Sequence, residues 1–401
     1  MPTRLLLLSV DRLPAWMLSA WGATWVSTPA IDALAGRGLI CDRLVATSLE
    51  PRRNLADLAD GVLADAAGAG LSPMLITDDA ALAASQVAPT VAVQVVPAVV
   101  PRRTPRTPAE TNLGRLFAAA RNAVDGGHGM VWVHAGSLGL AWDAPESFRE
   151  PYVDPDDPPP PAGGAVPSVR IDADTDPDLV VGYRQLYAAQ LTLLDRLIGE
   201  LVASLPPGDG AGNGWTICIA GVRGIPLGLH GWIGVPNPPT AERPFGETVH
   251  LPVLLVDASG RMAGQRYPGL LIPADVGMTL RDLLGVPAAV PHAALDGQPG
   301  RSLEGLFADW SHQDRDRVIC AGPGGVAVVT AAWHLVMEPH PSRTIPARLF
   351  AKPDDFFELC DVADRCPEAL ANLTSVAEMA LGGELNRAWG SPLEGGVRPL
   401  P

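Results

Sequence analysis

Residues 5–12 read LLLLSVDR, and this short stretch decides the fold. Its first six residues carry no charge and begin with four consecutive leucines. A continuous apolar run of this length predicts a β-strand that is buried on both faces, which is typical of a parallel sheet. Asp11 and Arg12 follow at once, so a charged pair stands at the carboxyl end of the strand. Ligand sites of open α/β sheets lie at that end.

The residues after this strand predict a helix and then a return to the sheet. Residues 27–29, STP, offer a hydroxyl cap and a proline for the first turn, and we expect a helix over residues 30–37 that Gly38 ends. Apolar residues spaced by three and four over residues 183–205 predict a long helix later in the chain. Further apolar runs predict strands at residues 74–77, 130–134 and 215–220. This alternation predicts the α/β class.

Length and composition set limits on the class of protein. A chain of 401 residues can bury a large core, and its net charge of −15 argues against nucleic acid or an anionic membrane as a partner. No stretch approaches the roughly 20 apolar residues of a membrane span, and the first apolar run is too short for a signal peptide. Five scattered cysteines form no metal-binding pattern, and we expect Cys218 and Cys320 to be buried. We therefore expect a cytoplasmic, reduced protein.

The order of motifs resembles the sulfatases, within the alkaline-phosphatase-like superfamily. In that family an apolar strand ends in paired aspartates, and a TPN-LD-LA-GV-F helix and a Cys/Ser-x-Pro-x-Arg segment follow. Here the first strand is followed by TPAIDALA at residues 28–35 and by Pro51 and Arg53. The family's later motifs are matched by WDAP at residues 142–145, by LGLHG at 227–231, and by the segment from Phe357 to Leu373. The resemblance therefore covers nearly the whole chain.

This resemblance implies the architecture. We expect an alkaline-phosphatase/sulfatase-like, mostly parallel sheet flanked by helices over residues 1–306, with an exposed proline-rich loop at about 145–170. Residues 307–401 are expected to form a smaller α+β subdomain, with an antiparallel sheet and a helix.

The residues that carry sulfatase chemistry are replaced, according to the same resemblance. Arg12 stands at the second aspartate of the metal pair, and Leu49 stands at the nucleophile position. Val222 and Arg223 stand at the metal aspartate and its neighbouring ligand. Of the four side-chain metal ligands only Asp11 remains, and a hard cation such as Ca²⁺ needs six to eight oxygen ligands. An aliphatic side chain cannot act as a nucleophile.

Neighbouring residues offer little replacement for this chemistry. Ser48, adjacent to the nucleophile position, is the fallback nucleophile, but without a metal or a base its hydroxyl is expected to be inert. The family's Asp-x-His-x-Pro motif falls on Ser137 and Gly139, so both functional side chains are absent. His134 lies just before them, at the end of a predicted strand, and we interpret it as a hydrogen-bonded structural residue.

If the family register holds, Arg12, Arg53 and Arg223 converge at the carboxyl edge of the sheet. One interpretation is a buried network with Asp11 that keeps the cleft open. The other is an oxyanion pocket for sulfate, phosphate or carboxylate, with the three arginines and His230 as the anion-binding candidates.

The sequence favours a sulfatase-like pseudoenzyme with a degenerate active site that serves as an anion-binding or protein-interaction module. We expect no cofactor; the expected partner is a small oxyanion or a sulfated or phosphorylated ligand, and a homo-oligomer is a further hypothesis. The alternative is an active hydrolase of sulfuric or phosphoric esters with a non-standard site, and only this alternative calls for Ca²⁺.

Overall fold

The computed structural model describes residues 3–59, 61–85, 91–207, 214–285, 298, 300–309, 315–338, 347–390 and 393. The two ends of the expected division, residues 1–2 and 394–401, lie outside the described residues. No helix in the described part of the chain is long and apolar enough to cross a membrane.

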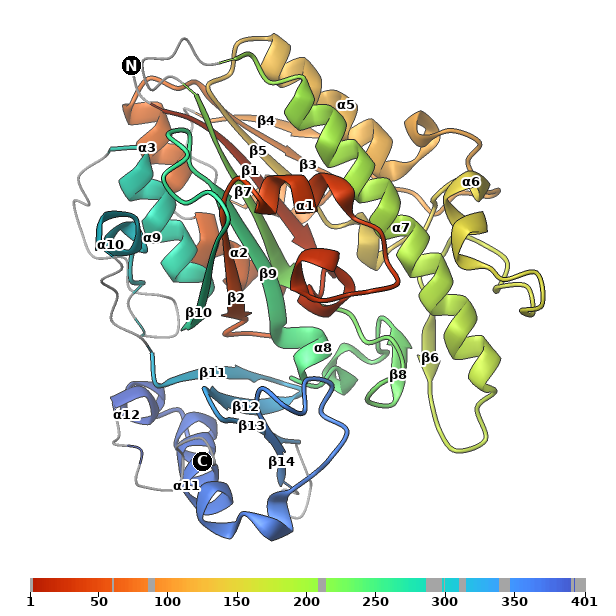
Figure 1. Ribbon diagram of the computed structural model, residues 1–401, viewed down its shortest axis with the longest axis vertical. Helices are drawn as coiled ribbons and strands as arrows, with labels where there is room; N and C mark the ends of the chain where they lie inside the picture. Colours follow the sequence, from red (N-terminus) through yellow and green to blue (C-terminus); the bar gives the residue numbers. More distant parts are fainter. Residues whose placement is uncertain are drawn as a thin grey trace.

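An eight-stranded sheet forms the centre of the molecule (Figure 1). Its order in space is β10 (Gln265–Leu271), β2 (Leu39–Val45), β9 (His250–Val256), β7 (Trp215–Arg223), β1 (Arg4–Asp11), β5 (Met130–Ala135), β3 (Pro73–Thr77) and β4 (Ala92–Val95). β9 runs antiparallel to both of its neighbours, and the other adjacent pairs are parallel. The mostly parallel sheet predicted from the leucine run is confirmed, with seven of the eight residues of β1 buried.

Helices cover both faces of this sheet and close two hydrophobic cores. One core receives α2 (Pro51–Ala59), α3 (Val62–Gly68) and α9 (Pro273–Leu283), and the other receives α1 (Pro29–Ala35), α5 (Asn112–Asp125) and α7 (Pro177–Ala203). Shorter helices lie between the strands: α4 (Ala80–Ala84), α6 (Glu146–Arg149), α8 (Gly246–Val249) and α10 (Glu304–Asp309). α6 falls within the segment expected to be a proline-rich loop, as does β6 (Ser168–Arg170), which pairs with β8 (Trp232–Gly234).

The start of α1 differs from the expectation of a hydroxyl cap. The Thr28 side chain makes no capping hydrogen bond, and its hydroxyl accepts instead from the backbone N–H of Ser19 at 3.2 Å. The carboxylate of Asp195, from the middle of α7, accepts the N–H groups of Ala30 at 3.0 Å and Ile31 at 2.8 Å. A helix N-terminus carries unpaired N–H groups, and here a distant carboxylate satisfies them. The prediction of a hydroxyl cap is therefore wrong, because a carboxylate from a distant helix accepts the first N–H groups in place of the adjacent hydroxyl.

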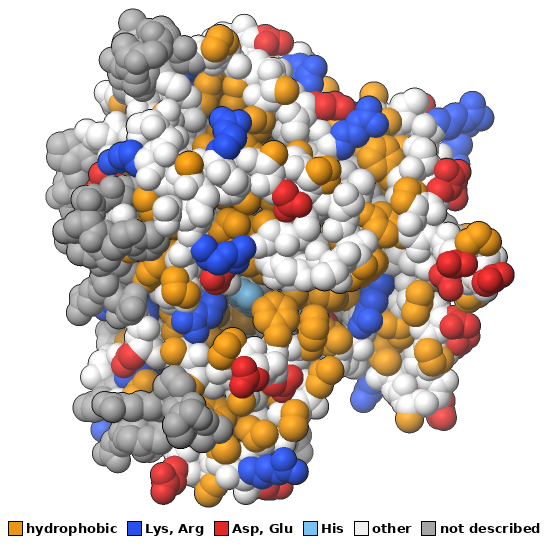
Figure 2. Space-filling model, in the orientation of Figure 1, with side chains coloured by type: hydrophobic (Ala, Val, Ile, Leu, Met, Phe, Trp, Pro, Cys, Tyr) orange, Lys and Arg blue, Asp and Glu red, His pale blue; other side chains and the backbone are white. Residues whose placement is uncertain are grey.

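A second, four-stranded antiparallel sheet lies at one end of the large one. It consists of β11 (Arg317–Gly322), β12 (Gly325–Thr330), β13 (Trp333–Met337) and β14 (Ala347–Ala351), and it packs against α11 (Pro367–Leu381) and α12 (Leu385–Gly390). Ala321 donates its N–H to the carbonyl of Thr47 at 3.1 Å, which joins β11 to the segment after β2. Figure 2 shows a hollow on this side of the molecule, with hydrophobic and basic side chains around a histidine.

Candidate functional site

Two neighbouring strands bring charged residues to the carboxyl edge of the large sheet. Asp11 ends β1, Arg12 follows it, and Arg223 ends β7. A β-bulge after Val10 pairs Asp11 with Arg223 in the parallel ladder. Arg12 has a left-handed backbone with a φ of 66°, and the hydroxyl of Tyr187 donates to its carbonyl at 2.5 Å. Strained backbone of this kind in a non-glycine residue persists only where the surroundings fix it.

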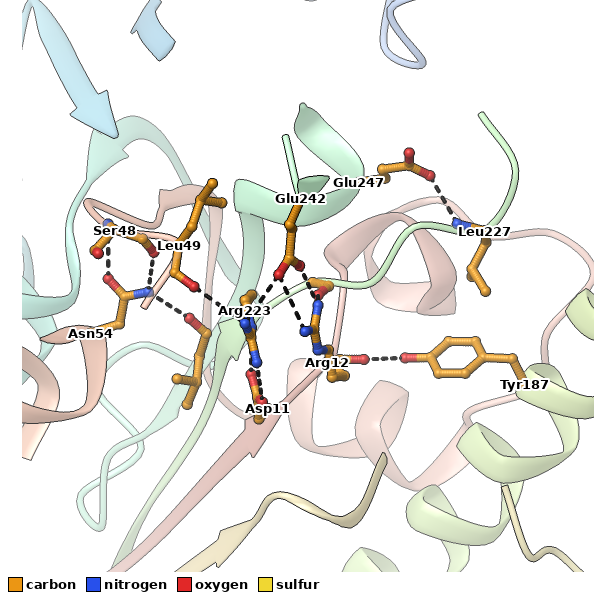
Figure 3. A network of polar contacts seen from close by, with 12 residues as sticks. Asp11, Arg12, Ser48, Leu49, Asn54, Tyr187, Arg223, Leu227, Glu242 and Glu247 are labelled. Carbon is orange, nitrogen blue, oxygen red and sulfur yellow. Dashed lines mark hydrogen bonds and ion pairs between the residues drawn. The ribbon is translucent and has the colours of Figure 1, made fainter. Parts of the chain in front are cut away.

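The two arginines share a buried set of carboxylates (Figure 3). Nε and Nη2 of Arg223 donate to the two oxygens of Asp11 at 3.2 and 2.9 Å. Its Nη1 donates to Glu242 at 3.1 Å and to the carbonyl of Leu49 at 3.2 Å. Arg12 donates to both oxygens of Glu242, through Nη1 and, at 3.2 Å, through Nη2. These four charged residues (Asp11, Arg12, Arg223 and Glu242) form what we call the ion-pair cluster.

The cluster is buried and electrically balanced. The side chains of Arg12 and Glu242 are each 3% exposed. Burial by itself would raise the pKa of Asp11, but the charges of Arg223 and Arg12 outweigh it and hold that pKa below its usual value of 3.8. Burial would lower the pKa of Arg223, and the charges of Asp11 and Glu242 raise it instead. Opposite charges within the cluster therefore stabilise the ionised forms of Asp11 and Arg223 against the effect of burial.

The segment at the expected nucleophile position is packed and tied down. The side chain of Leu49 is 7% exposed and belongs to the core beneath the sheet. Asn54, which is 1% exposed, accepts the N–H of Ser48 at 3.2 Å and donates to the carbonyl of the same residue at 2.8 Å. The hydroxyl of Ser48 accepts the N–H of Glu50 at 3.1 Å, and its backbone forms a parallel bridge with Ala321 of β11.

In the turn after β5, backbone N–H groups are held by a carboxylate, and a glycine lies beside Arg12. Asp78 accepts the N–H groups of Gly136 at 2.6 Å and Ser137 at 3.1 Å. A Cβ at Gly139 would lie 3.3 Å from Cγ of Arg12, so the arginine side chain already fills the space beside this position. Where the sulfatase pattern carries a histidine, this chain therefore has a glycine packed against a guanidinium-bearing side chain.

His134 is held inside the sheet by two buried neighbours. The indole N–H of Trp132 donates to the hydroxyl of Ser9 at 2.8 Å, and that hydroxyl lies 2.9 Å from Nδ1 of His134. Burial lowers the pKa of His134 below its usual value, against the opposing charges of Asp78 and Asp11. The prediction that His134 is hydrogen-bonded is confirmed.

His230 belongs to a separate set of contacts. Its Nδ1 lies 3.1 Å from Glu247, its Nε2 lies 3.2 Å from the carbonyl of Glu358, and its ring stacks on Phe245 at 3.9 Å between centroids. Burial would lower the pKa of His230, but the hydrogen bond and charge of Glu247 raise it above its usual value. The other oxygen of Glu247 accepts the N–H of Leu227 at 3.0 Å, which fixes the turn before His230.

The structure brings together some of the residues predicted from sequence and separates others. Asp11, Arg12 and Arg223 meet as expected. Arg53 differs: its side chain is 49% exposed, and its Nε lies 3.3 Å from Glu50 at the surface. Unlike Arg12, Arg53 is therefore not a buried side chain, and its role as an anion-binding candidate stays a prediction. Val222 is buried in the core, with its carbonyl accepting from the Asn54 amide at 2.9 Å.

Sequence reasoning missed Glu242 and Asn54, which together organise this region. Glu242 lies in a loop rich in proline between β8 and α8, where no periodic pattern marks it. A charge count could have found it, because two buried guanidinium groups beside the single carboxylate of Asp11 require another acid. Asn54 lies on the first turns of α2 and resembles any polar helix residue in sequence.

The residues present do not fit a divalent cation. The oxygens of Asp11 and Glu242 all face guanidinium groups, and Arg12 and Arg223 would repel a second cation. Within the described ranges, no group of three or more His, Cys, Asp or Glu side chains is placed to hold a metal ion. A calcium-type ion takes six to eight oxygen ligands, so this donor set falls well short.

The large sheet with helices on both faces, the antiparallel C-terminal sheet and the charged strand ends define an alkaline-phosphatase-like fold. Solved structures share it over almost their whole length. The phosphonate monoester hydrolase of Agrobacterium radiobacter is 18% identical, with a TM-score of 0.72 over 96% of this chain and 95% of that one. The phosphonate monoester hydrolase of Silicibacter pomeroyi is also 18% identical, with a TM-score of 0.68 over 96% of this chain and 95% of its own.

A third similar structure was solved in complex with its substrate, D-glucosamine-2-N,6-O-disulfate. It is 13% identical, with a TM-score of 0.70 over 98% of this chain and 100% of that one. No protein-family model and no curated protein matches the chain. At these identities the likeness establishes the fold, and the predicted resemblance to the sulfatase fold is confirmed at that level.

Proposed function

We propose that this chain is a non-catalytic protein of the sulfatase fold that acts by binding and not by turnover. The observation that carries the proposal is the ion-pair cluster. Two guanidinium groups lie at the strand ends where the resemblance expects metal ligands, and both are bonded to carboxylates. A buried cation has thus been replaced by cationic side chains that belong to the chain itself.

The environment of the expected nucleophile supports the same proposal. Leu49 offers no nucleophilic atom, and the hydroxyl of Ser48 accepts a hydrogen bond from the backbone of Glu50. A serine hydroxyl becomes a nucleophile only beside a base or a metal ion. Ser48 contacts the side-chain amide of Asn54 and the backbones of Glu50 and Ala321, and none of these groups is a base.

The cluster also favours structural ion pairing over oxyanion binding. Arg223 donates two hydrogen bonds to the carboxylate of Asp11, and Arg12 donates two to the carboxylate of Glu242. Two positive and two negative charges leave no net attraction for sulfate or phosphate. We therefore assign Arg12 and Arg223 to holding the former cleft in shape, and we place the binding function elsewhere on the protein.

Hydrolysis assays test this proposal against the alternative of an active ester hydrolase. The purified protein is incubated with 4-nitrophenyl sulfate, 4-nitrophenyl phosphate and a phosphonate monoester, each with added Ca²⁺, Mg²⁺ or Mn²⁺. We expect release of nitrophenol at the rate of the buffer control. Turnover that disappears in both Ser48→Ala and Asp11→Ala would overturn the proposal, because a contaminating enzyme would persist in these variants.

A further inference from the structure

A cavity of about 510 Å³ lies outside the ion-pair cluster, between the large sheet and the C-terminal sheet. Its lining comes from the ends of β2, β9 and β10, from the β12–β13 turn and from the loop after β14. Cavities of about 300 to 1,000 Å³ hold small organic ligands in proteins. None of the four residues of the cluster lines this cavity in the described part of the chain.

Aromatic rings form one wall of the cavity. Trp16 and Phe357 meet edge to face at 5.8 Å between centroids, and Phe356 meets Phe357 in the same way at 5.2 Å. The ring of His250, which lies 5.6 Å from that of Phe356, extends this wall. The side chain of Phe357 is 43% exposed, so part of an aromatic surface faces the cavity uncovered. Such a surface gains free energy when another ring covers it.

The loop that carries Phe356 and Phe357 is fixed by its neighbour Glu358. This residue is buried and has a left-handed backbone with a φ of 59°. Its carboxylate accepts the N–H of Gly246 at 2.8 Å and contacts His334. Strained backbone of this kind persists only where the surroundings hold it. The aromatic wall is therefore in place before a ligand arrives, which reduces the entropy lost on binding.

The charged residues of the lining carry both signs. Within the part of the chain that the structure describes, the acidic and the permanently charged basic side chains are equal in number: Asp42, Glu247 and Glu358, and Arg43, Arg266 and Lys352. Asp42 forms an ion pair with Arg266, and Glu358 lies 2.9 Å from Nζ of Lys352. Four of the six charges are therefore matched in pairs across the lining itself.

The other two charges are also engaged by the protein. Glu247 is 2% exposed at its side chain and lies 3.1 Å from Nδ1 of His230, whose pKa it raises. Among its contacts, Arg43 donates to the carbonyl of Pro268 at 2.6 Å and to that of Ala331 at 3.2 Å. A charged ligand would have to disrupt such contacts or lose its hydration without a counter-charge, and both cost free energy.

The imidazole of His250 adds no charge near neutral pH. Its Nε2 lies 2.6 Å from the carbonyl of Asp42, at the start of β9. Burial, with the charges of Lys352 and Arg43 adding to it, lowers the pKa of His250 to about 4. The histidine that completes the aromatic wall is therefore an uncharged ring under physiological conditions.

We propose that this cavity binds an uncharged small molecule with an aromatic body, which lies against Trp16, Phe356 and Phe357 and leaves the ion pairs of the lining intact. Figure 2 shows hydrophobic side chains gathered along one side of the hollow. The inference rests on the proposed function only in identifying this cavity as the place where the protein binds its ligand. Hydrolysis assays report on the strand ends and binding assays on the cavity, so the two claims can fail separately.

Calorimetric titration of the full chain with naphthalene-2-carboxamide tests the inference. Naphthalene-2-carboxylate and 2-naphthylmethylammonium carry the same rings with a negative or a positive charge. We expect one carboxamide per chain, and an affinity for each charged probe that is lower by about tenfold or more, because an ion loses hydration in the cavity without gaining a free counter-charge.

Two variants locate the binding. Phe357→Ala should weaken the carboxamide by about tenfold, because it removes an aromatic contact. The matched control is Leu359→Ala, two residues further along the same loop and outside the lining, where the side chain is 68% exposed. It should leave the affinity unchanged.

Three results would overturn the inference. The first is no binding of the carboxamide, and the second is a charged probe that binds as tightly as the carboxamide. The third is unchanged carboxamide affinity in a folded Phe357→Ala protein. If Phe357→Ala does not fold, the ranking of the three probes on the wild-type chain decides the matter alone.

Discussion

Neutralising Glu242 perturbs the cluster at the point where both arginines meet. Glu242→Gln keeps the size of the side chain but removes one negative charge and sets an amide NH₂ against a guanidinium group. Arg12 then faces the remaining amide oxygen and the carbonyl of Gly224 at 3.4 Å, and neither neutral group compensates its charge. Removing one partner of a buried ion pair costs about 3 to 5 kcal/mol. With side chains 3% exposed on both sides of the pair, we expect the free energy of unfolding to fall by that amount.

Urea unfolding followed by circular dichroism measures this loss. The matched control is Glu200→Gln, which breaks the exposed pair of Glu200 with Arg196 on α7, where the side chains are 45% and 58% exposed. The control should change stability by less than about 0.5 kcal/mol. A Glu242→Gln protein within about 1 kcal/mol of wild type, the value of a surface pair, would refute the reasoning.

Two further variants separate charge from packing. Removing both partners, with Arg12→Met and Glu242→Leu together, leaves the neutral pair of Asp11 and Arg223. This double variant should recover about 1 to 3 kcal/mol relative to Glu242→Gln, because no charge remains uncompensated. Glu242→Ala leaves space and one net positive charge. Sulfate at constant ionic strength should then raise the melting temperature of this variant and not that of the wild type.

Two other predictions concern the surroundings of the cluster. Asn54→Ala leaves the carbonyl of Val222 and the backbone of Ser48 without their amide partner. It should lower the free energy of unfolding in urea by about 2 kcal/mol or more. The control Asn122→Ala, at an exposed position of α5, should not change it measurably. Between pH 6.5 and about 4 the unfolded chain binds a proton at His250 that the folded chain does not, so stability should fall as the pH falls through this window, by up to about 3 kcal/mol. His250→Asn should remove that part of the pH dependence, and an unchanged pH profile in this variant would contradict the assignment.

The sequence predicts the large sheet well because its strands are short, continuous apolar runs, as β1 and β7 illustrate. It predicts helix ends less well, because they depend on distant residues. The cap of α1 comes from Asp195, far along the chain. The alanine- and leucine-rich residues 54–68 lie in two helices, α2 and α3, and Gly61 precedes the second with a φ of 79°. The sequence pattern did not predict β14. This strand is short and lies at the edge of the small sheet, where it pairs with β13.

The candidate site was predictable where the strand ends determine it. Asp11, Arg12 and Arg223 follow from the register of β1 and β7. Arg53 lies on the first turn of α2, and its side chain is 49% exposed and contacts Glu50. Glu242 reaches the cluster from a loop, and loop paths depend on tertiary packing that no local pattern encodes.

Titration of the protein with Ca²⁺, Mg²⁺ and Mn²⁺, followed by calorimetry and by elemental analysis after dialysis, tests the central claim most directly. If arginine side chains have taken the place of a cation, none of the three metals should bind stoichiometrically or raise the melting temperature. Binding of one ion per chain that is lost in Asp11→Asn would contradict the account, because it would show that the carboxylates of the cluster leave their guanidinium partners for a metal.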